Sequence, residues 1–203
     1  MKKVFLAGEG PNDLGKWAHH PSFRAKYGKG VIEGLLSKVR AEGWEVRESV
    51  RWKDVIKFRV GGHASAEERA VKGLVLMAKE AGCDIVAFVR DRDGSRKHPN
   101  NKREEDIKRG MREVRQTLDN CPDIIGGVAI KAIEAWILAI RGEDQSEKVT
   151  NPKERLKEIF EEEGKESCTV SYVEVIDNGS LENLPEDARS LRAWLEKAEK
   201  TLG

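Results

Sequence analysis

An apolar run at residues 85–89, followed closely by Asp91 and Asp93, constrains this chain more than any other feature. The run indicates a strand of an open parallel sheet, and ligands bind outside the carboxyl ends of such strands. Two carboxylates at that point favour a hard cation such as Mg²⁺, which prefers oxygen ligands. Asp and Gly are also common in turns, so an ordinary strand-to-loop turn is the alternative interpretation.

A second acidic group follows the first apolar run, at residues 3–7. Glu9 is flanked by glycines, which allow the backbone to approach a ligand closely, and Asp13 lies four residues further on. If the two apolar strands are neighbours, we expect Glu9, Asp91 and Asp93 to meet at one rim of the sheet. A divalent cation would offset the mutual repulsion of these carboxylates.

A third acid, Glu134, lies within the apolar segment 129–140, where a strand over residues 124–130 runs into a helix that we expect to be buried, with Glu134 in its first turn. Burying an unpaired carboxylate is costly, so this side chain needs a compensating partner. An ion pair with Lys131, or the positive end of the helix dipole, could supply one. We expect a role in the site instead, because the first turn of such a helix faces the same rim.

The order of these three acidic segments resembles a known family. The E-G pair after the first strand and the D-x-D-G after a later strand are similar to the Toprim domain of topoisomerases, primases and overcoming-lysogenization-defect (OLD-like) nucleases. Together with the block at residues 134–139, they resemble a family of small bacterial and archaeal Toprim-like proteins. Further similar segments are residues 151–153, Tyr172 and residues 190–194.

The resemblance implies a role for each acid. Glu9 would be the general acid/base, and Asp91 and Asp93 would coordinate Mg²⁺ or Mn²⁺. Asp13 matches the second acid that some OLD-like nucleases carry, and Glu134 or Asp13 would help to place a second ion.

The alternation of strand-like and helical segments predicts an α/β fold. The expected architecture is a Toprim-like three-layer fold with a mostly parallel sheet and a small C-terminal helical cap. Residues 1–143 would form the α/β domain, and residues 144–203 a helical elaboration packed on it. A chain of this length is expected to form one domain, or one domain with such an elaboration.

Positive charge is concentrated near the acidic segments although the net charge is only +1. Residues 1–60 carry 13 Lys and Arg against 7 Asp and Glu. A cluster of cations beside a metal site is expected for a protein that binds phosphate or nucleic acid. The alternative is a solvated loop balanced by the acids at residues 104–106. The candidate phosphate-binding residues are Arg90, Arg92, Arg96, Lys97, Arg103 and Lys16.

Two compositional features indicate the expected location. No stretch approaches the roughly 20 apolar residues that a membrane-spanning helix needs. The 3 cysteines are odd in number and far apart, which fits neither a disulfide framework nor a zinc site. We therefore expect a protein of the reducing cytoplasm, without a membrane partner.

The sequence predicts a Mg²⁺-dependent enzyme that cleaves a phosphodiester, most simply a nuclease. One alternative is a non-catalytic Toprim-like module that binds nucleotide or nucleic acid within a larger complex, such as a defence system with an ATPase partner. Another is a metal-dependent phosphotransferase or phosphatase acting on a small nucleotide. No Ser/His/Asp order, P-loop or CxxC motif supports other hydrolase, NTPase or zinc chemistry.

Overall fold

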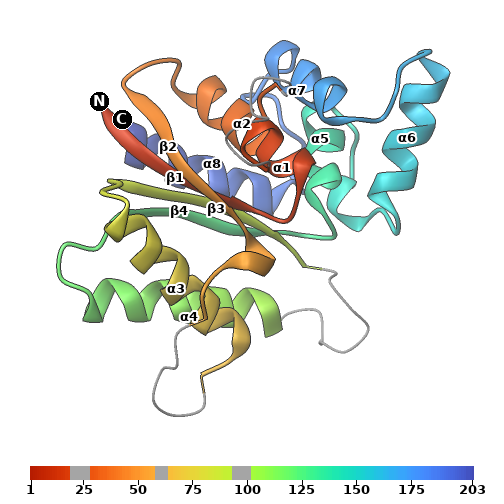
Figure 1. The fold of residues 1–203 in the computed structure, drawn as a ribbon. Helices are drawn as coiled ribbons and strands as arrows, with labels where there is room; N and C mark the ends of the chain where they lie inside the picture. The colour runs from red at the N-terminus through yellow and green to blue at the C-terminus, as the bar shows by residue number, and fades with distance from the viewer. Residues whose placement is uncertain (19–27, 58–63, 93–101) are drawn as a thin grey trace.

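The computed structural model describes residues 1–18, 28–57, 64–92 and 102–203. Within them the chain forms a four-stranded sheet with helices on both faces (Figure 1). All strand pairs are parallel, and the order is β2-β1-β3-β4. The strands are β1 (Lys2–Gly8), β2 (Trp44–Arg51), β3 (Ile85–Asp91) and β4 (Asp123–Ala129).

The α-helices are α1 (Pro11–Leu14), α2 (Val31–Val39), α3 (Ala66–Glu80), α4 (Lys102–Thr117), α5 (Ile133–Ile140), α6 (Pro152–Glu162), α7 (Thr169–Asn178) and α8 (Arg189–Leu202). Short 3₁₀ turns are η1 (Gly15–Ala18), η3 (Trp52–Asp54) and η4 (Ser146–Lys148). Parallel neighbours need long crossover connections, which explains why helices separate successive strands.

The apolar run that begins at Ile85 forms the interior strand β3, as the sequence predicts. β3 pairs with β1 on one side, where Val4 lies opposite Ile85, and with β4 on the other. Because all strands are parallel, the carboxyl ends of β1, β3 and β4 lie at the same edge. The predicted convergence of their following loops is a direct consequence of this topology.

Alternate side chains of the strands serve two separate cores. Val4 and Leu6 of β1 face the layer that contains α2, α5 and α8. Phe5 and Ala7 face the layer formed by α3 and α4. Successive residues of a strand point to opposite faces, so one short apolar strand fills both cores. The predicted three-layer α/β fold is therefore confirmed.

Helices from the C-terminal segment share the core of the sheet. Trp194 of α8 is fully buried and donates a 3.0 Å hydrogen bond from Nε1 to the carbonyl of Phe88 in β3. A Cβ on Gly127 of β4 would lie 3.1 Å from the Trp194 ring, so glycine allows this close packing. The proposed division at residue 144 stays a prediction. No helix in the described ranges is long and apolar enough to cross a membrane.

Candidate active site at the carboxyl ends of the strands

Asp91 ends β3 and joins this strand to α5. Its Oδ1 accepts a 2.9 Å hydrogen bond from the amide of Ile133, the first residue of α5. Ala132 precedes the helix and has no side chain that can cap it, so Asp91 satisfies an amide that the helix leaves free. This hydrogen bond uses Oδ1 and not Oδ2.

Glu9 follows β1 and connects it with the end of β3. Its Oε1 accepts a 3.2 Å hydrogen bond from the Asp91 amide and forms an ion pair with the guanidinium of Arg90. The Glu9 side chain is 39% exposed, whereas that of Arg90 is 12% exposed. Glu9 is thus the accessible carboxylate of the rim, held in place by groups at the end of β3.

Asp13 is buried and fixes the turn that carries Glu9. Its Oδ2 accepts hydrogen bonds from the amides of Glu9 and Gly10, so the carboxylate holds both residues after β1. A Cβ on Gly8 would lie 2.5 Å from the Asp13 Cβ, which shows how closely the turn folds back. Neither of these hydrogen bonds uses Asp13 Oδ1.

Glu134 lies in the first turn of α5 and is only 6% exposed. The hydroxyl of Tyr172 in α7 lies 3.1 Å from Ser167 Oγ, and it is near enough to Glu134 for the charge of that carboxylate to act on it. Burial, together with the negative charge of Glu134, raises the pKa of Tyr172 to about 12. The phenol therefore stays protonated at neutral pH and can donate to the carboxylate.

The four acids affect one another electrostatically. Burial raises the pKa of Asp91 to about 8, and the negative charges of Glu9, Asp13 and Glu134 contribute to this rise. Burial also raises the pKa of Asp13 to about 6, although the amides of Glu9 and Gly10 oppose the change. Neighbouring carboxyl groups with raised pKa values are common at functional sites.

Two cavities adjoin these acids and share three of them. A cavity of about 290 Å³ is lined by Glu9, Asp13, Asp91 and Glu134. A second, of about 360 Å³, is lined by Glu9, Asp91 and Glu134 together with Lys131 and Lys153. The carboxyl edge of the sheet is therefore an open acidic site with two lysines at its border.

The donor set suits a hard divalent cation, because every candidate ligand is a carboxylate oxygen. The raised pKa of Asp91 fits the same interpretation, since a cation at this place would favour its ionised form. Within the described ranges, no three acidic, His or Cys side chains are already arranged as ligands of one ion. Asp93, the remaining predicted ligand, lies outside the described residues.

The predicted phosphate-binding residues occupy different positions. Arg90 bridges Glu9 and Glu67, and its guanidinium lies 5.0 Å above the ring of Trp52. Arg103 is buried and also pairs with Glu67, at 3.0 Å.

The remaining predicted phosphate-binding residues do not line the acidic cavities or lie outside the described residues. Lys16 lies 3.5 Å from Glu33, away from the acidic cavities. Arg92 directly follows β3, and its amide donates to the carbonyl of Ala129. Arg96 and Lys97 lie outside the described residues.

Two lysines at the site were not among the phosphate-binding residues predicted from the sequence, where Lys131 was considered only as a partner of Glu134. Lys131 follows β4 and has a left-handed backbone, with φ of 72°, which is unusual for a residue other than glycine. Lys153 is exposed at the start of α6 and reaches the site only because the C-terminal segment folds back over it. Lys131 could have been predicted as a site residue, because it directly follows a strand that ends at the rim.

Comparison of the chain with protein-family models, curated proteins and solved structures gave no match. The resemblance to Toprim proteins therefore depends on the short motifs alone.

Proposed function

We propose that this protein is a Mg²⁺- or Mn²⁺-dependent enzyme that cleaves phosphodiester bonds, and that the acidic rim is its active site. The observation that carries the proposal is the convergence of Glu9, Asp13, Asp91 and Glu134 beside two shared cavities. Buried carboxylates that repel each other reduce stability unless a ligand offsets their charge. A structural role alone does not explain why so many acids gather here.

The ligands of the cation would be Asp91, Glu134 and Asp13, with Asp93 as a further candidate. When bound, the ion would polarise the phosphate and stabilise the charge that develops on its oxygens. Asp91 can offer Oδ2 without losing its hydrogen bond to the Ile133 amide. Tyr172 of α7 interacts electrostatically with Glu134 and would help to orient it.

Glu9 would transfer the proton, because it is the most exposed of the four carboxylates. The ion pair with Arg90 and the hydrogen bond from the Asp91 amide both use Oε1, so Oε2 can accept a proton from a nucleophile. Lys131 and Lys153 line the same cavity and supply positive charge for a phosphate. The arrangement thus combines acid/base, metal-binding and phosphate-binding groups.

The test is divalent-ion-dependent cleavage of single- and double-stranded DNA and RNA by the wild type and Glu9→Gln. Loss of a general acid/base typically costs 10²–10⁴ in rate, so we expect a decrease of about that size with nucleic-acid binding retained. The matched control is Glu48→Gln, which makes the same chemical change at an exposed position of β2. Tight binding by the wild type without any cleavage would favour the binding-module alternative.

A further inference from the structure

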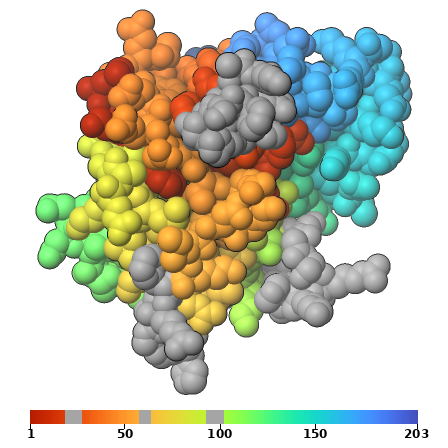
Figure 2. All heavy atoms as spheres, viewed as in Figure 1, coloured from red at the N-terminus to blue at the C-terminus, as the bar shows by residue number. Residues whose placement is uncertain are grey.

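A third cavity continues the site toward η3 and α3. Its volume is about 380 Å³, and its walls include Glu9, Trp52, Lys53, Lys57, Glu67 and Arg90. Because Glu9 also lines both acidic cavities, this groove begins where the proposed chemistry takes place. Figure 2 shows the orange segment that follows β2 at the surface beside α3, on the face in view.

The carboxylate in this groove is already neutralised by protein groups. Glu67 Oε1 pairs with Arg90 at 3.2 Å and with Arg103 at 3.0 Å, and its Oε2 accepts from the Trp52 indole at 3.1 Å. Lys53 and Lys57 are exposed and form no ion pair within the described ranges. These two lysines therefore provide the available positive charge of the groove.

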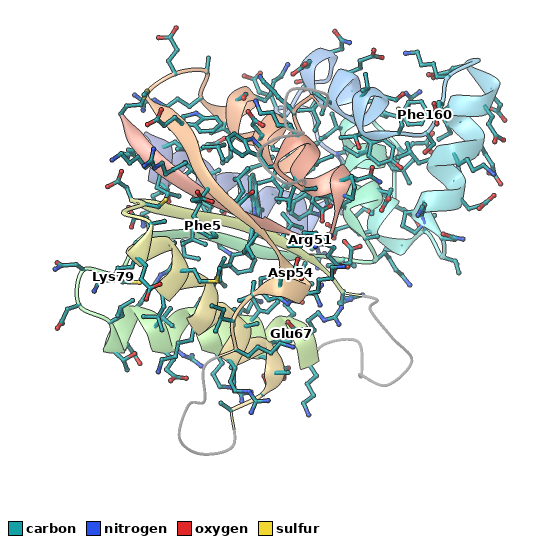
Figure 3. All side chains as sticks on the ribbon, in the orientation of Figure 1. Phe5, Arg51, Asp54, Glu67, Lys79 and Phe160 are labelled. Atoms are coloured by element: carbon teal, nitrogen blue, oxygen red, sulfur yellow. The ribbon has the colours of Figure 1, made fainter. Side chains whose placement is uncertain are left out.

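The segment that carries the lysines is held firmly against the domain. A 2.7 Å ion pair between Arg51 and Asp54 closes the η3 turn, and Figure 3 shows both side chains near the end of β2. A Cβ on Gly73 of α3 would lie 1.8 Å from the carbonyl oxygen of Ile56, so the segment contacts the helix backbone directly. The segment beside the groove therefore packs directly against α3.

Ile56 lies outside the lining of the cavity and directly precedes Lys57 in the sequence. Its side chain is 57% exposed, one of few large apolar side chains on the described surface. Exposed lysines at the border of the groove suit the charged phosphates of a nucleic-acid strand.

We infer that this groove binds two further phosphates of the strand whose neighbouring phosphodiester is cleaved at the acidic rim. The inference rests on the proposed function and specifies its substrate: a polynucleotide rather than a mononucleotide. Lys53 and Lys57 contact the flanking phosphate groups. A free mononucleotide has no further phosphate of this kind and gains nothing from the groove.

The test compares wild type with a Lys53→Gln/Lys57→Gln double variant, by fluorescence polarisation of a labelled single-stranded 12-mer of DNA or RNA. In a plot of log binding constant against log salt concentration, each phosphate contact on a single strand contributes about 0.7 to the steepness of the slope. The slope of the double variant should therefore be shallower than that of the wild type by about 1.4. Binding at moderate salt should weaken roughly tenfold. Affinity for a 5′-mononucleotide, measured by calorimetry with Ca²⁺ present, should stay unchanged.

The matched control is Lys2→Gln/Lys200→Gln, which removes the same charge at the opposite end of the sheet. Lys2 begins β1, and its Nζ donates to the carbonyl of Thr201, so Lys200 lies nearby. Three results would each overturn the inference. They are a salt-dependence slope of the double variant equal to that of the control variant, an equal loss of affinity for the mononucleotide and the 12-mer, and a wild type that binds no strand. If the double variant loses the slope but the wild type never cleaves, the groove stands and the proposed function fails.

Discussion

Replacing Asp91 with Asn should stabilise the metal-free protein at alkaline pH. An unfolded Asp releases its proton near pH 4, whereas in the folded protein burial and the neighbouring carboxylates raise the pKa of Asp91 to about 8. Between these values the native state binds more protons than the unfolded state. The stability of the wild type therefore falls as pH rises through this window, and the loss is complete above pH 8.

The magnitude follows from the pKa change of about four units, at 1.36 kcal/mol each, which sets an upper bound on the order of 5 kcal/mol. Asn keeps an acceptor for the Ile133 amide but presents an NH₂ group in place of Oδ2. We therefore expect a gain of about 2–3 kcal/mol at pH 9, and almost none at pH 4. For a chain of this size that corresponds to roughly 4–12 °C in melting temperature.

The assay is thermal unfolding of the wild type and Asp91→Asn in EDTA from pH 4 to pH 9, repeated with Mg²⁺ or Mn²⁺. Divalent ion at ten times its dissociation constant should stabilise the wild type by about 1.4 kcal/mol and the variant by about 0.4 kcal/mol or less. Glu48→Asn controls for loss of an exposed carboxylate. If Asp91→Asn is less stable than the wild type at pH 9, the proposed repulsion among the acids is wrong.

Three further substitutions test individual contacts. Tyr172→Phe should cost about 1 kcal/mol in urea unfolding, because it removes the hydroxyl that lies 3.1 Å from Ser167 Oγ. It should also reduce the stabilisation by Mg²⁺, because that hydroxyl interacts electrostatically with Glu134. An undiminished Mg²⁺ response would contradict this role. Gly73→Ala should lower the free energy of unfolding by about 1–3 kcal/mol and weaken nucleic-acid binding, because the new Cβ would displace Ile56 and the segment that carries the lysines. Unchanged binding would show that the groove does not depend on the packing of this segment against α3. Lys131→Gly should raise stability by about 1 kcal/mol, because glycine adopts the left-handed backbone without strain. It should also slow cleavage, because it removes a positive charge from the cavity. Faster cleavage would exclude a phosphate contact.

The sheet and the positions of three acids could be predicted from the sequence. Short apolar runs such as residues 85–89 indicate buried strands, and parallel pairing brings the residues that follow them to one edge. This reasoning needs only local pattern and topology, and it placed Glu9, Asp91 and Glu134 at the same site.

The partners of these residues could not be predicted in the same way. Arg90 and Arg103 carry the expected charge, but tertiary packing pairs both with Glu67, which is distant in the sequence. The contact between Tyr172 and Glu134 likewise depends on how α7 packs. Long-range pairing is decided by the packing of whole elements, and single residues carry no local signal for it.

The central claim is that the acidic rim binds a divalent cation, and Mn²⁺ binding followed by electron paramagnetic resonance tests it most directly. We expect the wild type to bind Mn²⁺ at this site, competitively with Mg²⁺, and Asp91→Asn and Glu134→Gln each to weaken binding by about 10-fold or more. Mn²⁺ binding that is absent from the wild type, or unaffected by both substitutions, would contradict the account.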